Sequence, residues 1–231
     1  MPPSSRLAAP PAEMPETESG EARNRILLTA ERLFAEHGYN GVSLRAIMAE
    51  AEVNTAAIHY YFRNKEGLLR AIFELRVAPM NAERIQRLDA IDAATPAGGK
   101  PDIGAVLRAF IEPAVRRSRE ASGQAFNRIS ALCSVDPSAA VRQVVFDSYD
   151  TVARRFTALL RRACPHLTDE EFYWRQHSIY GGMMYLRTNN GRIAYLLGDQ
   201  GQNHSETALQ QLLIFLTAGM SAPGAGPQQT P

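Results

Sequence analysis

The apolar positions of this chain recur every three or four residues rather than every second residue. Residues 21–37 carry Ile26, Leu27, Ala30, Leu33 and Phe34. This spacing places the five side chains on one face of a helix, and Gly38 supplies the expected C-terminal stop. The folded part of the chain is therefore predicted to begin with an amphipathic helix.

Two short helices are predicted next. Ser43 is suited to cap a helix with apolar positions at Leu44, Ile47, Met48 and Ala51. After a turn over residues 51–53, Asn54 is suited to cap a second helix that contains the run His59, Tyr60, Tyr61 and Phe62. A half-buried strand is the competing interpretation of that run. The cap position before it favours the helix.

The rest of the chain continues the helical pattern. Asn64 is suited to cap a helix from Lys65, which Pro79 is expected to kink or break before the pattern resumes over residues 80–88. Residues 92–102 are predicted to form a loop. Further helices are expected over residues 103–120 (with a kink at Pro113), 124–134, 137–164, 168–188 and 204–220. No convincing run of alternating strand residues is found, so the fold class is all-α.

Composition limits the kinds of site that the chain can hold. The 231 residues are 45% hydrophobic and 21% charged, with a formal net charge of +1, so a site for a polyanion would have to be local. Cys133 and Cys164 have neither metal-ligand nor disulfide spacing, and no metal or cofactor is expected. The absence of a long apolar run or a signal peptide predicts no membrane span and a cytoplasmic protein.

The outward positions of the third helix suggest a function. If Ile58 points toward the core, Tyr61 and Phe62 lie on the same, inward side of the helix. Ala56, His59 and Tyr60 then face away from the core. Two short helices with small and hydrogen-bonding residues at the start of the second describe a helix-turn-helix. Thr55 and Ala56 would let the helix approach the major groove of DNA, and His59 and Tyr60 could contact phosphate or sugar. Exposed aromatic residues can equally mark a protein interface.

The run RILLTAERLFAEHGYNGVSLRAIMAEAEVNTAAIHYYFRNKEGLL, residues 25–69, resembles the DNA-binding domain of TetR-family transcriptional regulators. The shared elements are A-x-x-L-F-x-x-x-G-Y, S-L-R-x-I and Y-Y-F-x-N-K-E-x-L. The resemblance implies a homodimer that usually represses transcription and releases DNA when a small ligand binds its C-terminal domain. It also implies DNA contacts at Ser43, Arg45, Thr55, Ala56, His59, Tyr60, Tyr61 and Lys65.

One of these positions departs from the family. The family often has Tyr where this chain has His59. An imidazole that gains a proton near pH 6.5 could make operator affinity depend on pH.

The domain boundaries follow from these patterns. Residues 1–20 and 221–231 are expected to be disordered tails. Residues 21–66 would form the helix-turn-helix DNA-binding domain, and residues 67–220 a helical domain for ligand binding and dimerisation.

The C-terminal half resembles the family only in its expected architecture. Helices 168–188 and 204–220 are the candidates for a four-helix interface with a partner subunit, and Leu209, Leu212, Leu213, Leu216 and Met220 form an apolar face that could serve either this interface or the subunit's own core. Gly181 and Gly182 would permit close approach. The candidate residues for a hydrophobic or aromatic ligand are Phe110, Phe126, Cys133, Phe146, Trp174, Tyr180, Met183, Met184 and Arg187.

The function predicted from the sequence is a homodimeric repressor that a small hydrophobic or aromatic effector releases from a pseudo-palindromic, double-stranded operator. A transcriptional activator of the same fold and a helical protein-interaction adaptor are the alternatives. His177 with Asp169 or Glu170 is the nearest approach to a catalytic pair. Without nucleophile, metal or phosphate-loop spacing, no enzymatic activity is predicted.

Overall fold

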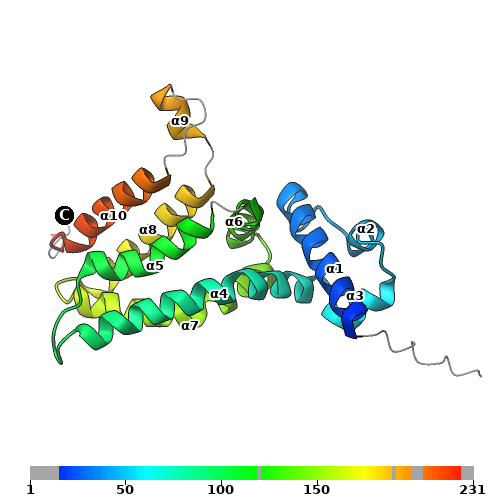
Figure 1. Ribbon diagram of the computed structural model, residues 1–231. Coiled ribbons are helices and arrows are strands. Elements are labelled where there is room, and N and C mark those ends of the chain that lie inside the picture. Colours follow the sequence, from blue (N-terminus) through cyan, green and yellow to red (C-terminus); the bar gives the residue numbers. More distant parts are fainter. Residues whose placement is uncertain (1–15, 119–120, 189–190, 199–204, 225–231) are drawn as a thin grey trace, which may run out of the picture.

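A computed structural model describes residues 16–118, 121–188, 191–198 and 205–224, and every element in these ranges is a helix (Figure 1). The helices are α1 (Glu16–His37), α2 (Leu44–Glu50), α3 (Thr55–Phe62), α4 (Lys65–Ala94), α5 (Ile103–Arg117), α6 (Ala121–Ser134), α7 (Ala139–Ala163), α8 (Asp169–Thr188), α9 (Arg192–Leu197) and α10 (Ser205–Ser221). The all-α prediction is confirmed. No described helix is long and apolar enough to cross a membrane.

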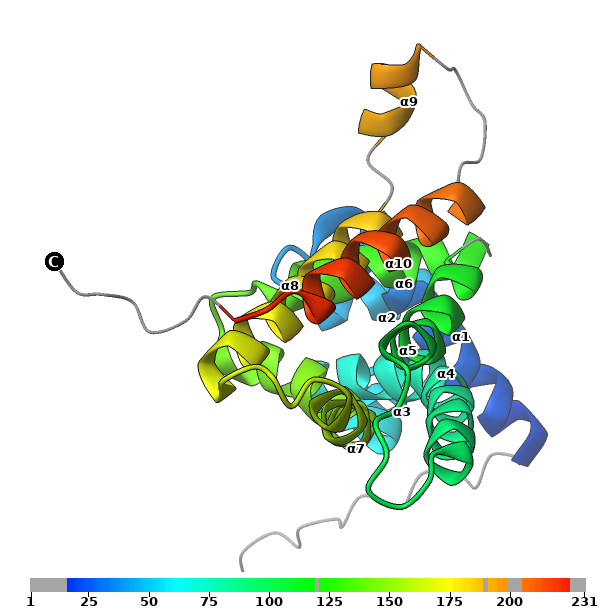
Figure 2. The same ribbon diagram turned by 90° about the vertical axis from the view of Figure 1, so that its left-hand side faces the viewer.

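The helices form two groups that α4 connects (Figure 1). The first three helices pack together around Phe34, Ile47 and Ile58, each with no exposed surface. Helices α4, α5, α7, α8 and α10 form the larger group. Helix α6 contacts α1 of the first group and α7 and α8 of the larger group. Figure 2 shows α8 and α10 side by side on one flank of the larger group.

Helix α4 runs without a break through Pro79 and ends at Ala94. Pro79 was predicted to kink or break the helix; a break before Met80 is wrong, and the predicted loop begins three residues later than expected, at Thr95. A proline inside a helix costs about 3 kcal/mol through a lost hydrogen bond and a steric clash. The burial of Phe73, Val77 and Leu88 along the same helix offsets this cost.

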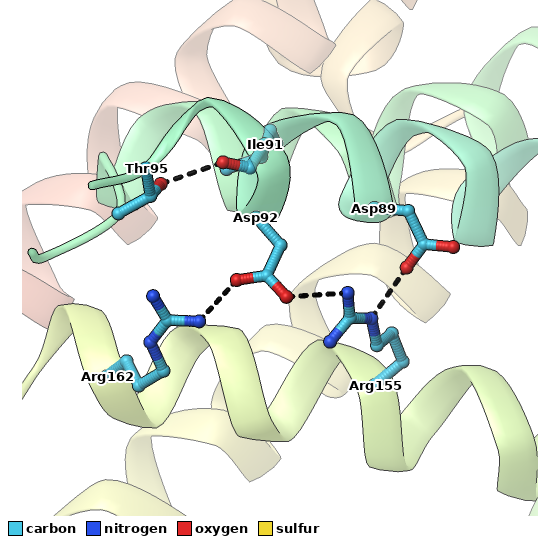
Figure 3. Close-up of polar contacts among 6 residues, drawn as sticks. All are labelled: Asp89, Ile91, Asp92, Thr95, Arg155 and Arg162. Carbon is cyan, nitrogen blue, oxygen red and sulfur yellow. Dashed lines mark hydrogen bonds and ion pairs between the residues drawn. The ribbon is translucent and has the colours of Figure 1, made fainter. Parts of the chain in front are cut away.

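The end of α4 is attached to α7 by a cluster of ion pairs (Figure 3). Asp92 accepts hydrogen bonds from Arg162 and, at 2.8 Å, from Arg155, whose Nε also donates to Asp89 at 2.7 Å. The bonds from Arg162 and Arg155 hold the pKa of Asp92 below its ordinary value. Arg70 adds a similar contact to Asp147 of α7 at 2.9 Å, near the other end of α4.

The remaining helix boundaries differ from the predictions mainly at chain ends. Helix α1 begins at Glu16, five residues before the predicted start, so residues 16–20 do not belong to a tail; residues 1–15 and 225–231 lie outside the described residues. Helix α5 ends at Arg117 and passes unbroken through Pro113. The short helix α9 was not predicted.

The apolar face of α10 that was considered for the dimer interface lies inside the subunit. Leu209, Leu213, Leu216 and Met220 are buried, and Leu212 is partly buried. A β-carbon at Gly182 of α8 would lie 3.1 Å from Leu212 Cδ1, so the glycine serves close packing within the subunit. The outward face of α10 carries Ile214 and Phe215 instead, which are 56% and 74% exposed.

Candidate nucleic-acid interface

The two helices of the helix-turn-helix begin at side-chain caps. Ser43 Oγ accepts a hydrogen bond from the backbone N–H of Ala46 at 3.1 Å, and Asn54 Oδ1 accepts one from that of Ala57 at 3.0 Å. Each cap satisfies a backbone donor that has no partner within the first helical turn. Both caps were predicted, and the helical interpretation of the aromatic run is confirmed.

Helix α3 presents one face to the core and another to the exterior. Ile58 is fully buried and Phe62 is 4% exposed, whereas Thr55, Ala56 and His59 are exposed and Tyr60 is 79% exposed. Tyr61 is half-buried, and its ring meets that of Tyr60 edge-on, with 5.0 Å between the centroids. The predicted division of the four ring residues between core and surface is confirmed.

Positive charge lies next to this outward face. Arg45 of α2 is exposed and makes no ion pair within the described part of the chain. The Nζ atom of Lys65, at the start of α4, lies 4.2 Å from the ring centroid of Tyr39 and 5.8 Å from that of Phe34. Partial burial lowers the pKa of Lys65. Lys65 therefore joins α4 to α1 through cation–π contacts.

His59 has its tautomer fixed by a backbone contact. Its Nδ1 lies 2.9 Å from the carbonyl oxygen of Arg63. Because a carbonyl oxygen can only accept, Nδ1 must carry the proton. Nε2 of the neutral ring then has only a lone pair, and it becomes a donor to phosphate only when the ring gains a second proton. No pattern in the sequence predicts this contact.

A strained turn joins α3 to α4. Arg63 has φ 64° and ψ −54°, and the N–H of Asn64 donates to the carbonyl of Phe62 at 2.7 Å, which together define a γ-turn with positive φ. Asn64 Oδ1 then caps α4 by accepting from Gly67 N at 2.7 Å. A β-carbon at Gly67 would collide with the carbonyl oxygen of Phe62. The turn therefore requires a glycine and fixes α3 closely to α4.

The candidate ligand residues differ in burial and in whether they line a cavity. Phe110, Phe126, Cys133 and Met183 are buried, and Tyr180 and Met184 are partly buried. Phe146 and Trp174 are 58% and 66% exposed and do not line the cavity described next. Phe126 and Arg187 are the members that do line it.

The cavity lies among α4, α5, α6 and α8 and has a volume of about 230 Å³. Its apolar lining includes Leu75, Pro79 and Phe126, and its charged lining consists of Arg76, Arg117 and Arg187. Arg76 and Arg117 were not predicted as site residues, because arginines on the polar side of an amphipathic helix resemble ordinary surface charges.

Next to the cavity region lies a buried arginine that the sequence analysis also missed. Arg84 has no exposed surface, donates from Nε to the carbonyl of Phe110 at 2.7 Å, and stacks over the Phe110 ring at 4.2 Å. Burial lowers its pKa to about 10, so the group stays charged at neutral pH. Its position on the apolar stripe with Val77, Met80 and Leu88 was the available signal.

The capped pair α2 and α3, with an exposed aromatic and basic face and a long helix leading into a second helical group, defines a helix-turn-helix transcriptional regulator. Comparison with known proteins agrees at both ends of the chain. Residues 26–72 match the family of bacterial regulatory proteins of the tetR type, and residues 108–219 match the tetracyclin repressor-like C-terminal domain. The chain belongs to the TetR family of DNA-binding transcriptional regulators. This family consists of transcription factors and not of enzymes, in agreement with the prediction.

Relatives with assigned roles match over a short region. The HTH-type transcriptional regulator UidR of Escherichia coli (strain K12) is 33% identical over 57 residues, which cover 25% of this chain and 29% of UidR. The HTH-type transcriptional repressor AcnR of Corynebacterium diphtheriae is 39% identical over 56 residues, or 24% of this chain and 30% of AcnR. The chain thus spans less than a third of the length of these relatives.

Solved structures match over most of the chain. The fatty acid degradation regulator FadR from Bacillus halodurans aligns with a TM-score of 0.62 at 16% identity, covering 87% of this chain and 96% of FadR. The hemolysin II transcriptional regulator HlyIIR aligns with a TM-score of 0.60 at 16% identity, covering 86% and 98%. At these identities the agreement concerns the fold.

Proposed function

We propose that this chain is a homodimeric repressor that binds a pseudo-palindromic operator through α2 and α3 and leaves it when a small effector occupies the C-terminal domain. The observation that carries the proposal is the outward face of α3, where Thr55, Ala56, His59 and Tyr60 are all exposed beside the exposed Arg45. These side chains supply methyl groups, hydroxyl groups and charge at the end of a helix that is narrow enough for the major groove.

The roles at this face differ by residue. Thr55 and Ala56 lie in the first turn of α3, where a recognition helix approaches base edges. Ser43, Arg45, His59 and Tyr60 would contact phosphate or sugar and fix the position of the helix. Tyr61 and Lys65 would act at the edge of this surface, since both are partly buried.

The second subunit would cover the outer face of α8 and α10. Tyr173, Trp174 and Tyr185 of α8 are 59%, 66% and 55% exposed, and Ile214 and Phe215 of α10 are similarly exposed. Trp174 and Tyr185 lie about three helical turns apart on α8, and α10 packs beside α8, as two helices do in one half of a four-helix interface. Large exposed apolar side chains that gather on two neighbouring helices are typical of a subunit contact.

Helix α9 would extend this contact. Ile193, Tyr195, Leu196 and Leu197 are between 58% and 84% exposed. The helix lies beyond the neighbouring ends of α8 and α10 (Figures 1 and 2). A partner subunit seated on α8 and α10 would bring apolar surface within reach of it.

The test is a selection of genomic duplexes by the full-length protein at near-physiological salt. The wild-type protein is expected to enrich one palindromic motif, and Tyr60→Ala is expected to lose that enrichment. Leu132→Ala, which truncates an exposed apolar side chain on α6, should retain it. Unselective recovery of DNA by the wild-type protein would contradict the proposed function.

A further inference from the structure

The cavity between α4, α5, α6 and α8 is lined by three arginines and, among the described residues, by no carboxylate. Arg117 Nε is buried without a hydrogen-bond partner in the described part of the chain. Arg187 donates from Nε to Asn127 Oδ1 at 3.0 Å, and this amide oxygen carries no full charge. Arg117 and Arg187 are both partly buried, and a partly buried guanidinium group with a neutral partner or none is costly, so an anion in the cavity would relieve this cost.

The surroundings of the cavity reinforce its positive potential. The charged, buried Arg84 is close enough to Arg187 for the two guanidinium groups to repel each other. Among the described residues, Glu83 is a carboxylate that acts on Arg117 through space, and it already binds Arg116 and, at 2.8 Å, Arg87. Glu83 therefore does not neutralise the cavity arginines.

The apolar part of the cavity lining indicates that the ligand also has an apolar part. Leu75, Pro79 and Phe126 line the same space, and they would receive hydrocarbon rather than a second charge. A cavity of about 230 Å³ is smaller than the roughly 300–1,000 Å³ usual for ligand sites, so it suits a compact ligand. A guanidinium group matches the two oxygens of a carboxylate in a planar, bidentate arrangement.

We infer that the effector of this regulator is a small carboxylic acid with a compact apolar body, whose carboxylate binds Arg117 and Arg187 and draws Arg76 away from Glu31. The inference rests on the proposed function, because it names the ligand class of the same C-terminal site. It also supplies a route by which occupancy could reach the DNA-binding domain.

The route begins at Arg76, which lines the cavity and also binds α1. Its Nε and Nη2 donate to the two carboxylate oxygens of Glu31 at 2.8 Å and 2.6 Å. The side chain of Glu31 is 5% exposed. A second carboxylate beside Arg76 would compete for this guanidinium and weaken a contact between α1 and α4. Ligand and operator would then favour different positions of α1.

Calorimetry on the full-length protein tests the ligand class without DNA. The probes are phenylacetate and hexanoate, each paired with its primary amide, and inorganic phosphate. The carboxylates are expected to bind, and each amide at least tenfold more weakly. Arg117→Gln and Arg187→Gln should each weaken carboxylate binding about tenfold to a hundredfold, the usual effect of one charged hydrogen bond. Arg108→Gln, an exposed α5 arginine outside the cavity lining, should leave it unchanged.

A second variant tests the competition. Glu31→Gln keeps the size of the side chain and removes its charge, so carboxylates should bind about tenfold more tightly. Circular dichroism would establish that each variant is folded.

The outcomes separate the inference from the proposed function. No carboxylate binding up to about 10 mM, equal binding of acids and amides, or binding of phosphate as tight as that of the acids would overturn the inference while leaving DNA binding untouched. Carboxylate binding by a protein that selects no operator would support the ligand class and contradict the repressor.

Discussion

The guanidinium of Arg76 binds both carboxylate oxygens of Glu31, and this ion pair joins α4 to α1 at the wall of the cavity. The two partners differ in burial, since Arg76 keeps 24% of its side-chain surface exposed and Glu31 keeps 5%. Water can therefore solvate a lone Arg76 better than a lone Glu31.

This difference predicts unequal effects of two substitutions. Arg76→Gln should lower the free energy of unfolding by about 3 kcal/mol, because it leaves a buried carboxylate without its partner. Glu31→Gln should cost about 1 kcal/mol, since the remaining guanidinium is better solvated and the amide oxygen can still accept. Urea denaturation measures both. An equal or larger loss for Glu31→Gln would contradict the proposed asymmetry.

Operator affinity should rise when the buffer is acidified from about pH 8 to about pH 6, because a charged imidazole has two donors and a neutral one has only one. The reason is the contact of His59 Nδ1 with the Arg63 carbonyl, which leaves Nε2 unable to donate to phosphate until the ring is charged. Fluorescence anisotropy with a labelled operator would follow the change. His59→Gln, which donates at every pH, should remove the dependence. An unchanged affinity of the wild-type protein over this range would exclude the role.

Gly67→Ala should destabilise the fold by about 1–3 kcal/mol, as overpacking against rigid atoms does. The added methyl group would meet the backbone carbonyl of Phe62, which cannot move without disturbing the γ-turn at Arg63. Gly219→Ala provides the matched control, because a β-carbon there has nothing within 4 Å, and it should be neutral or stabilising by up to about 1 kcal/mol. Thermal unfolding of the two variants should shift in opposite directions or at least differ clearly.

Acid should weaken the attachment of α4 to α7. The pKa of Asp92 is lowered by hydrogen bonds from Arg162 and Arg155, so its contribution to stability is complete above the unfolded pKa of about 3.9 and is lost as the pH falls through the lower, folded value. Asp92→Asn should therefore reduce the urea midpoint at pH 7 more than at pH 3. Asp150→Asn, in an exposed pair within α7, should show a smaller effect. A constant difference between wild type and Asp92→Asn across this range would refute the assignment.

Phe215→Glu should convert the proposed dimer into a folded monomer. The side chain is 74% exposed on the face proposed for the partner, and a buried charge without a partner would disfavour association. Val135→Glu, at a 70% exposed position between α6 and α7, should leave the dimer intact. Analytical ultracentrifugation distinguishes the two results. A monomeric wild-type protein at micromolar concentration would refute the dimer itself.

The DNA-binding half was predictable because its determinants are local. Ser43, Asn54 and Asn64 each cap a helix through the backbone three residues later, and such spacing is visible in a sequence. The position of Ile58 likewise determined which rings of α3 face outward.

The cavity depended on tertiary contacts that no local pattern contains. Arg76, Arg117 and Arg187 come from three different helices, and their convergence follows from packing. The predicted break at Pro79 is absent for the same reason, since the burial of distant parts of α4 outweighs the local cost of the proline. The leucines of α10 had two possible partners, and only the folded chain assigns them to the subunit's own core.

Because α4 is unbroken, a small tilt of the helix at Pro79 becomes a larger displacement at Lys65. At about 1.5 Å per residue, the stretch from Lys65 to Pro79 is roughly 21 Å long. A tilt of only about 5° around Pro79 would therefore displace Lys65, and the α3 helix fixed to it by the γ-turn, by roughly 2 Å. Such a displacement is several times the spread of about 0.5 Å in donor–acceptor distance over which a hydrogen bond forms. A ligand in the cavity thus needs to move its immediate neighbours by only a fraction of an ångström to misalign the protein on DNA.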